Sequence, residues 1–259
     1  MSERARWNDY PWELIREGPQ APEWHMALDA VITDEVGAGL RPPTLRIWEW
    51  SEPAVIIGRF QSLKNEVDPE GAQRHGVKVV RRVSGGGAMF VEPGNTITYS
   101  LSVPQALVQG MTFQQSYEYL DAWVLRALQD LGIKAWYQPL NDIASDIGKI
   151  GGAAQARRGG AVLHHVTMSY DIDVDKMVQV LRIGREKLSD KGTTSAKKRV
   201  DPLRSQTGLE RDVIIDRMLQ TFQGLASLTQ VSLGEATLDK ARTQAQEKFS
   251  SPEWTSQVP

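Results

Sequence analysis

The 259-residue chain contains no cysteine and only four histidines, so its chemistry must rest on lysine, arginine, carboxylates, hydroxyls or backbone groups. The lack of cysteine excludes disulfides, thiolate metal ligands and a cysteine nucleophile. So few histidines also disfavour a histidine zinc site. Three stretches then carry residue types and spacings suited to chemistry: 81–90, 141–165 and 190–200.

The first stretch, RRVSGGGAMF (81–90), places two arginines and a serine directly before three glycines. A folded domain retains consecutive glycines where a side chain would obstruct something, because they lose much backbone entropy on folding. Their N–H groups can form an anion-binding nest, and Arg82 can add a bidentate fork to a phosphate or carboxylate. The stretch is neither a GxGxxG fingerprint nor a Walker A loop. On the local pattern alone, a phosphate cradle and a plain β-turn explain it equally well.

In the second stretch, Lys149 lies between Gly148 and Ile150 at the start of a run that continues as Gly151-Gly152-Ala153-Ala154. Small neighbours let a lysine lie along a cleft, where its compact charge suits a phosphate or the oxygen of a reacting carbonyl. The alternative is an ordinary solvated lysine.

The third stretch, DKGTTSAKKRV (190–200), is basic and rich in hydroxyls. It reads either as a solvated loop or as a loop that folds over a nucleotide.

Hydrophobic patterning indicates the elements that position these stretches. Helical spacing predicts a helix over 22–36, another over 113–132 with Gly132 as its C-cap, and two amphipathic helices over 209–249. Strands are predicted over 44–50, 53–60, 77–83 and 96–103, with shorter ones around 135–137, 142–143, 149–155 and 160–171. Strands in the middle and helices at both ends predict an α+β domain with a mixed, mostly antiparallel sheet flanked by helices.

Composition bounds the class of protein. Hydrophobic residues make up 41% and charged residues 24% of the chain, as in ordinary globular proteins. A net charge of -2 gives no sign of a nucleic-acid partner, and no apolar run is long enough to span a membrane. The N-terminus lacks the apolar region of a signal peptide, so we expect a cytoplasmic protein. No linker is visible before about Phe249, which predicts one domain over 1–249 and a short tail over 250–259.

Taken in order, these stretches resemble the catalytic domain of lipoate–protein ligases, within the biotin/lipoate ligase superfamily. The family motifs RR-x-[ST]-GGG-A-x-[FY] and KGxxSxxxRV are matched by 81–90 and by 191–200. The motif ND followed by GKK[IV]-x-GSA is matched, with differences, by 141–142 and GKIGGAA (148–154), and HHGTLL approximately by HHVTMS (164–169). The segment 46–61 resembles the family's early β-hairpin. The resemblance covers about 24–200, and the ordered set is far more specific than any single motif.

The resemblance implies a class II aminoacyl-tRNA synthetase-like catalytic domain that activates lipoate with ATP to lipoyl-AMP and transfers the lipoyl group to a carrier lysine. Lys149 is the implied catalytic residue, in contact with the adenylate phosphate and the carbonyl oxygen. Asn141 and Asp142 would lie near the nucleotide, with Asp142 as a ligand of Mg²⁺. The other implied substrate- and adenylate-binding residues are Trp48, Arg82, Ser84, Gly85, Gly86, Gly87, Ala88, Gly152, Ala153, His165, Lys191 and Ser195. For His165, a satisfied core histidine is an equally good interpretation.

The sequence departs from the family pattern at several places. Val91-Glu92 stand where His-Asp is frequent, Val166 replaces a glycine, and Ile150 replaces a second lysine. After KFSSPEW (248–254) the sequence given stops at Pro259, where many family members continue into an accessory domain. Because some ligases carry that domain on a second polypeptide, the resemblance implies a separate accessory subunit that is needed for adenylation.

The implied carrier is an E2 lipoyl domain, a glycine-cleavage H protein or an H-like lipoate-binding protein. An octanoyltransferase shares the fold but works through an acyl-thioester on cysteine, and this chain has no cysteine. The RRxSGGG form of the motif disfavours a biotin ligase. An intact Lys149 argues against a non-catalytic subunit of a lipoylation assembly. The choice between lipoate and octanoate stays open.

Overall fold

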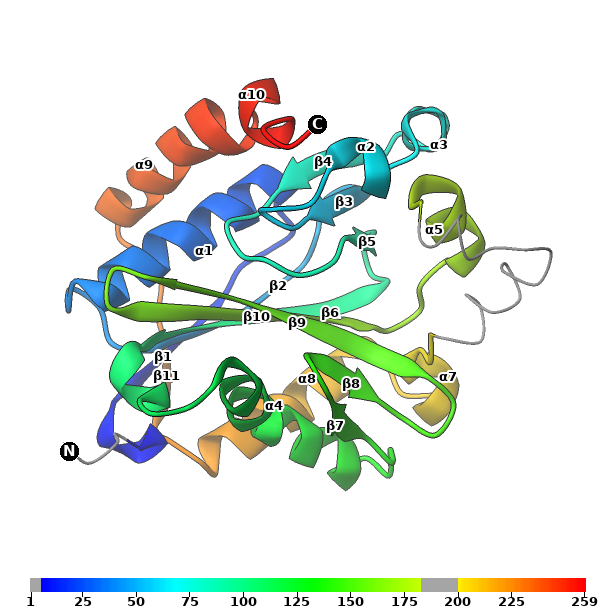
Figure 1. Cartoon of the computed structure of the whole chain (residues 1–259). Helices are drawn as coiled ribbons and strands as arrows, with labels where there is room; N and C mark the ends of the chain where they lie inside the picture. Colours follow the sequence, from blue (N-terminus) through cyan, green and yellow to red (C-terminus); the bar gives the residue numbers. More distant parts are fainter. Residues whose placement is uncertain (1–5, 183–199) are drawn as a thin grey trace.

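The computed structural model describes residues 6–182 and 200–259, which form two sheets with helices packed around them (Figure 1). The large sheet has eight strands in the order β11-β1-β2-β6-β10-β9-β8-β7. Strand β1 is parallel to β2 and to β11, and every other neighbouring pair is antiparallel. The predicted α+β class with a mostly antiparallel sheet is confirmed. Its strands are β1 (Trp12–Arg16), β2 (Thr44–Trp48), β6 (Thr96–Pro104), β7 (Trp136–Gln138), β8 (Asp142–Ala144), β9 (Lys149–Arg158), β10 (Ala161–Ser169) and β11 (Leu228–Gln230).

The small sheet has three strands in the order β4-β3-β5: β3 (Ala54–Ile57), β4 (Lys78–Arg81) and β5 (Met89–Val91). Strands β4 and β5 both pair with β3 and not with each other. The glycine-rich segment that joins them therefore crosses over the end of β3. The prediction of a single strand after this segment was incomplete, because β5 is only three residues long and β6 follows it closely.

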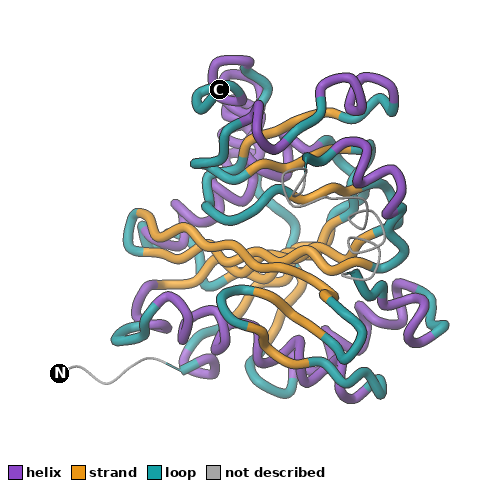
Figure 2. The backbone as a smooth tube through the Cα atoms, turned by 45° about the vertical axis from the view of Figure 1, so that its right-hand side comes forward, coloured by secondary structure: helices purple, strands orange, loops and turns teal. Residues whose placement is uncertain are grey.

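Helices cover both faces of the large sheet, as the views in Figures 1 and 2 show. Helices α1 (Pro22–Gly37) and α9 (Glu235–Gln244) lie on one face, and α4 (Phe113–Asp130) and α8 (Arg211–Gln223) lie on the other. Strands β2 and β6 are buried on both alternating sets of side chains, since apolar layers close over each face. Within the described residues, no helix is both long and apolar enough to cross a membrane.

The remaining elements are short and lie at the edges of these layers. They are η1 (Trp7–Asp9), α2 (Leu63–Glu66), α3 (Pro69–Arg74), η2 (Gln105–Val108), α5 (Val174–Val180), α7 (Leu203–Thr207), η3 (Ala245–Phe249) and α10 (Pro252–Thr255).

The strong local patterns predicted the helices correctly, whereas one short strand near each end of the chain was missed. The helices over 22–36 and 113–132 are confirmed, and Gly132 follows α4 in the left-handed region at φ 83°. The expectation of two helices over 209–249 missed β11, which lies between α8 and α9. Strand β1 was missed as well. Strand β1 lies between β2 and β11 and pairs with both, and β11 pairs with β1. These long-range pairings cannot be recognised from a local pattern.

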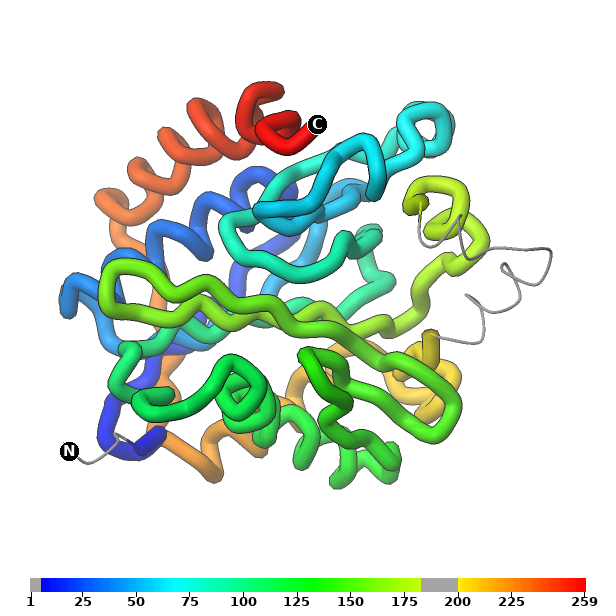
Figure 3. Tube along the Cα trace, viewed as in Figure 1, coloured from blue at the N-terminus to red at the C-terminus, as the bar shows by residue number. Residues whose placement is uncertain are grey.

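The segment 250–259 packs against β4, beside the small sheet (Figure 3). The Arg81 guanidinium donates hydrogen bonds to the carbonyls of Trp254, Thr255 and Val258 at 2.7–3.2 Å. The Trp254 indole in turn donates to the carbonyl of Arg81 at 2.8 Å. The first arginine of RRVSGGG therefore binds the C-terminal segment.

Candidate functional site

The glycine-rich segment lies between the end of β3 and strand β9. Gly86 adopts φ +85°, and a Cβ added there would stand 3.0 Å from Nη2 of Arg82 and 3.5 Å from Cβ of Ala154. A Cβ on Gly58 would stand 2.2 Å from the carbonyl oxygen of Gly86. Glycine is thus required at 58 by the close approach of the Gly86 backbone, and at 86 by its left-handed conformation and the nearby Arg82 guanidinium.

The Arg82 side chain holds this loop by hydrogen bonds to its backbone carbonyls. Its Nη2 donates to the carbonyls of Gly85 and Gly87 at 2.5 and 2.8 Å, and its Nη1 donates to the carbonyl of Ile56 at 3.0 Å. In a trans peptide the N–H points opposite to the C=O, so the amides of Gly86 and Ala88 face away from Arg82. No residue in the described part of the chain accepts a hydrogen bond from the Gly86 amide.

This geometry excludes one of the two interpretations of the segment. A hairpin turn is excluded, because the strands on either side of the loop do not pair with each other. Outward amides beside a buried guanidinium are typical of an anion-binding nest. Arg82 itself does not present the open fork that the sequence suggested, because most of its N–H groups already bind loop carbonyls. Burial lowers the pKa of Arg82 to about 10, which leaves it charged at neutral pH.

A chain of buried hydrogen bonds runs from this loop into helix α1. Ser84 Oγ lies 3.0 Å from Nε of Arg82 and 2.5 Å from Nε2 of His165. Nδ1 of His165 lies 3.1 Å from Oδ2 of Asp29, and Oδ1 of Asp29 accepts from Arg46 at 2.5 Å and from Ser100 at 2.7 Å. Sequence reasoning placed Ser84 and His165 at the site but missed Asp29. The available signal was a carboxylate among the apolar positions of the predicted 22–36 helix.

Lys149 and Asp142 meet on neighbouring strands. Nζ of Lys149 lies 2.7 Å from Oδ1 of Asp142, and the lysine side chain is 49% exposed. Gly152, which pairs with Asp142 across β8 and β9, leaves the space in which this ammonium lies, since a Cβ there would stand 2.9 Å from Nζ. The Asn141 side chain donates to the carbonyl of Ala153 at 2.6 Å and so fixes the β8–β9 junction.

The structure brings together most of the predicted residues. Strand β9 carries Lys149, Gly152 and Ala153 and contacts the glycine loop through its Ala154 side chain. The next described residue after the gap, Val200, bridges to Lys149, and the Asp201 amide donates to the carbonyl of Lys149 at 2.9 Å. Lys191 and Ser195 lie outside the described residues.

Trp48 lies apart from Lys149, in the buried cluster between α1 and the small sheet. Its ring stacks on His25 with a centroid distance of 5.2 Å, and the Arg46 guanidinium lies 4.6 Å above it. The family resemblance also implies that Val55–Gly58 line an apolar tunnel with Trp48. Of these residues, Val55, Ile56 and Ile57 are fully buried in β3.

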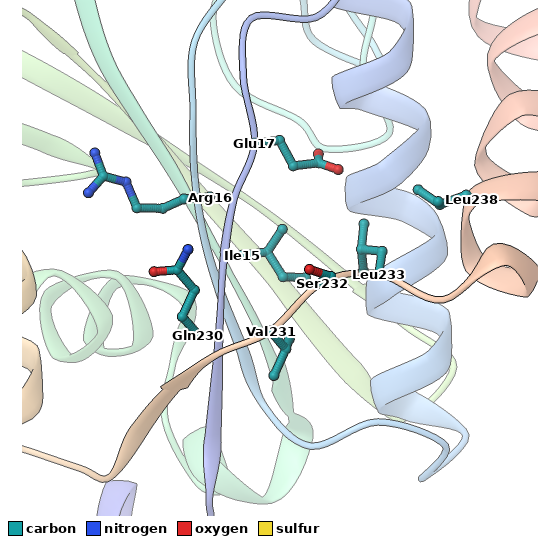
Figure 4. A pocket seen from close by; sticks show the side chains of 8 residues that line it. All are labelled: Ile15, Arg16, Glu17, Gln230, Val231, Ser232, Leu233 and Leu238. Atoms are coloured by element: carbon teal, nitrogen blue, oxygen red, sulfur yellow. The ribbon is translucent and has the colours of Figure 1, made fainter.

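A cavity of about 530 Å³ opens beside β1 (Figure 4). It is lined by Ile15, Arg16, Glu17, Gln230, Val231, Ser232, Leu233 and Leu238. None of these was predicted as a site residue, and β2, β6 and β10 separate β1 from the strand that carries Lys149. The cavity is therefore distinct from the site built around the glycine loop and β9.

The comparison with known families places the chain in a class of acyl-group ligases and transferases. Residues 21–223 match the model of the lipoyl protein ligase A/B catalytic domain, and the chain belongs to this family. Its resemblance to lipoate–protein ligases, inferred from the motifs, is thereby confirmed.

Three relatives place the chain within the family. The octanoyltransferase LipM of Lysinibacillus sphaericus is 25% identical, over 94% of this chain and 98% of its own. A probable lipoate-protein ligase A of Mycoplasma pneumoniae is 27% identical, over 93% of this chain and 70% of its own. A solved structure of a bi-partite lipoate protein ligase and its E2 lipoyl domain from Thermoplasma acidophilum superposes with a TM-score of 0.84, at 26% identity and 96% coverage of each chain.

Proposed function

We propose that this chain is the catalytic subunit of a lipoate–protein ligase, which transfers a lipoyl group from lipoyl-AMP to one lysine of a carrier protein. The observation that carries the proposal is the position of Lys149 and Asp142 on strands next to a glycine loop whose amides face outward. During acyl transfer from an acyl adenylate, negative charge develops on the phosphate and on the carbonyl oxygen. The Lys149 ammonium and the backbone amides of the loop are groups that can stabilise this charge. The absence of cysteine supports transfer without a thioester on the enzyme.

In the proposed reaction the carrier lysine, as a free amine, attacks the acyl carbon. The C–N bond forms, the bond from the acyl carbon to the phosphate oxygen breaks, AMP leaves, and the amine loses its proton to solvent. Lys149 stabilises the negative charge that develops on the carbonyl oxygen and on the departing phosphate. The loop of Gly85, Gly86, Gly87 and Ala88 binds the phosphate through backbone N–H groups, and Ser84 and Arg82 hold that loop in place.

The described residues offer Mg²⁺ one candidate carboxylate ligand, Asp142, and no complete metal site of their own. Among the described residues no group of three or more histidines and carboxylates is arranged to hold a metal. Mg²⁺ is commonly bound by one or two carboxylates together with substrate phosphates, so Asp142 can serve as the protein ligand when a nucleotide supplies the rest. Asn141 lies next to it. Trp48, Gly152, Ala153 and His165 remain proposed pocket residues, as do Lys191 and Ser195.

The proposed partners are a lipoyl carrier and an accessory subunit. The Thermoplasma structure is described as bi-partite and was solved as part of a study with an E2 lipoyl domain, and it is covered by this chain over 96% of its length. We accordingly propose an E2 lipoyl domain as the first carrier to test, with an H protein as the second. A separate accessory subunit is proposed for the adenylation step, in which lipoate and ATP give lipoyl-AMP and pyrophosphate.

The test follows the mass of purified carrier proteins incubated with the chain under three acyl donors: lipoate with ATP and Mg²⁺, preformed lipoyl-AMP, and an octanoyl thioester. We expect the carrier to gain one lipoyl group from lipoyl-AMP with the chain alone. With lipoate and ATP we expect the gain to depend on an accessory protein. No gain from lipoyl-AMP would refute the proposal.

Octanoyl transfer is the second candidate, because the first curated relative is an octanoyltransferase that aligns over almost its whole length. In the same assay it predicts a gain from the octanoyl thioester that needs no nucleotide. A gain with that donor alone would replace the ligase assignment by a transferase that works without a cysteine.

A further inference from the structure

Two adjacent histidines of β10 point to opposite faces of the large sheet and each meets a buried aspartate. His164 meets Asp121 of α4, with 2.6 Å between Nε2 and Oδ1. His165 meets Asp29 of α1, with 3.1 Å between Nδ1 and Oδ2. The two imidazoles therefore bind their carboxylates through different ring nitrogens, and the proton on a neutral ring follows the carboxylate.

The remaining ring nitrogens contact different partners. Nδ1 of His164 lies 3.1 Å from the Gln155 side-chain nitrogen, which is a donor, so this nitrogen accepts. Nε2 of His165 lies 2.5 Å from the Ser84 hydroxyl. If Nδ1 of His165 donates to Asp29, Nε2 is a bare acceptor and the Ser84 O–H must point at it. The oxygen of Ser84 then accepts a hydrogen bond from Nε of Arg82 at 3.0 Å. Each hydrogen bond from Arg82 through Ser84 and His165 to Asp29 thus has one defined donor and one defined acceptor.

The charge states of the buried groups support this direction. Burial alone would raise the pKa of Asp29, but the Arg46 charge and the hydrogen bonds from His165 and Ser100 lower it, so the carboxylate is ionised and accepts only. Burial lowers the pKa of His165, which keeps the imidazole neutral at pH 7. Asp29 and His165 are 1% and 5% exposed, so water cannot offer either group an alternative partner at low cost.

We propose that Asp29 is a positioning residue for the acyl-adenylate site: it fixes the Nδ1–H tautomer of His165, which orients Ser84 and, through Arg82, turns the glycine-loop amides outward. The proposal rests on the function proposed above for its activity readout. The tautomer itself is independent of any substrate. Asp29 lies on α1, and its hydrogen bond to His165 is its link to the glycine loop.

The tautomer can be measured directly on the full chain labelled with ¹⁵N-histidine. Long-range ¹H–¹⁵N spectra at pH 7 should show His165 protonated at Nδ1 and His164 protonated at Nε2. In Asp29→Asn the new amide can donate to Nδ1, so we expect the His165 proton to move to Nε2 while His164 stays unchanged. Ser100→Ala removes a different hydrogen bond to the same carboxylate, and it should leave both tautomers as they are.

Activity completes the test. With lipoyl-AMP and a carrier, Asp29→Asn should lose about 10- to 100-fold in rate, as is usual for partners that orient a functional histidine. Ser100→Ala should lose much less. Because Arg46 loses its buried counter-ion in Asp29→Asn, unfolding is followed in parallel and rates are compared at a temperature where both variants are folded.

A wild-type His165 that is protonated at Nε2 would overturn the proposal, and this needs no variant. An unchanged tautomer or an unchanged rate in folded Asp29→Asn would overturn it equally. If the wild-type chain transfers no acyl group from any donor, the proposed function fails. The measured tautomers of His165 still test whether Asp29 sets the protonation of that ring.

Discussion

The ammonium nitrogen of Lys149 lies 2.7 Å from Oδ1 of Asp142, across two antiparallel strands of the large sheet, β9 and β8, the second of which pairs with the edge strand β7. The pair forms because Gly152, opposite Asp142, has no side chain to fill the space. The lysine side chain is 49% exposed, so its ammonium is open to a bound substrate. The predictions below test how the two strands and the loop hold this arrangement.

Gly152→Ala is expected to displace Lys149 without unfolding the protein. The added Cβ would stand 2.9 Å from Nζ and 3.1 Å from Cε of Lys149, so the end of the lysine chain must move. This end is flexible, and the cost in stability should stay below about 1 kcal/mol. The rate of transfer from lipoyl-AMP should fall at least tenfold, because even a small misplacement of a reacting group is costly. A rate equal to wild type would contradict the proposed role of the Lys149 position.

Gly86→Ala and Gly87→Ala form a matched pair within the loop. Residue 86 has φ +85°, and its Cβ would stand 3.0 Å from the Arg82 guanidinium, whereas a Cβ at 87 meets nothing within 4 Å. We expect Gly86→Ala to lower the free energy of unfolding by about 1–2 kcal/mol, the cost of a left-handed alanine. Gly87→Ala should leave it unchanged or raise it by up to about 1 kcal/mol, since alanine restricts the unfolded chain. Urea titrations compare the two, and equal losses would contradict the loop conformation.

Stability should fall as the pH is lowered from neutrality. Burial, aided by the Arg46 charge, lowers the pKa of His25 to about 3, and burial lowers the pKa of His165 as well. Between about pH 6.5, where a histidine of the unfolded chain titrates, and the lowered pKa of each histidine in the folded protein, the unfolded chain binds more protons. Unfolding therefore becomes easier as the pH falls. Each such group contributes up to about 1.4 kcal/mol per pH unit.

Burial raises the pKa of the Asp29 carboxyl, but the Arg46 charge and the hydrogen bonds from His165 and Ser100 outweigh this effect and lower the pKa overall. The stability that ionised Asp29 contributes is therefore also lost as the pH falls through this lowered pKa. Urea denaturation at pH 7, 6, 5 and 4 measures the slope. His25→Gln removes one titrating group and should flatten the slope between pH 6 and 4. A variant slope as steep as that of the wild type would show that His25 is not the group that titrates.

Arg81→Lys should loosen the C-terminal segment from β4. The guanidinium binds carbonyls of Trp254, Thr255 and Val258 together with those of Gly58 and Gln61, and one ammonium cannot reach them all. Carbonyls left without partners cost about 1–3 kcal/mol each, so we expect a clear fall in melting temperature.

Trp254→Phe is the matched control for this interface. It keeps an aromatic ring beside Phe249 but removes the single hydrogen bond to the Arg81 carbonyl, which is worth about 1 kcal/mol. Calorimetry of the two variants should therefore show a larger loss for Arg81→Lys. Equal melting temperatures for Arg81→Lys and the wild type would mean that the segment does not depend on this arginine.

The sequence predicted those parts of the fold and site that have strong local signals. The apolar face of α4, its Gly132 terminator and the strands with β-branched runs are legible in a window of ten or twenty residues. The glycine loop and Lys149 were found by residue type and order. The missed features depend on contacts between residues far apart in the sequence. Strands β1 and β11 are short and are stabilised by pairing within the sheet. Asp29 contacts His165 only because β10 lies against α1 in the fold.

Arg82 shows the same limit in its chemistry. An arginine before three glycines predicts a fork for an anion, and only the three-dimensional structure shows that its N–H groups are turned onto the loop carbonyls. In the proposed function the backbone amides of the loop, and not the Arg82 side chain, therefore bind the phosphate.

The central claim is that Lys149 promotes acyl transfer from an adenylate to a carrier lysine, and one measurement tests it most directly. Wild type and Lys149→Ala are each incubated with preformed lipoyl-AMP and an E2 lipoyl domain, and the mass of the domain is followed in time. We predict one lipoyl group on the domain with the wild type and a rate about 10²- to 10³-fold lower for Lys149→Ala, the usual effect of removing a group that stabilises a developing oxyanion. A Lys149→Ala variant that modifies the domain as fast as the wild type would contradict the claim.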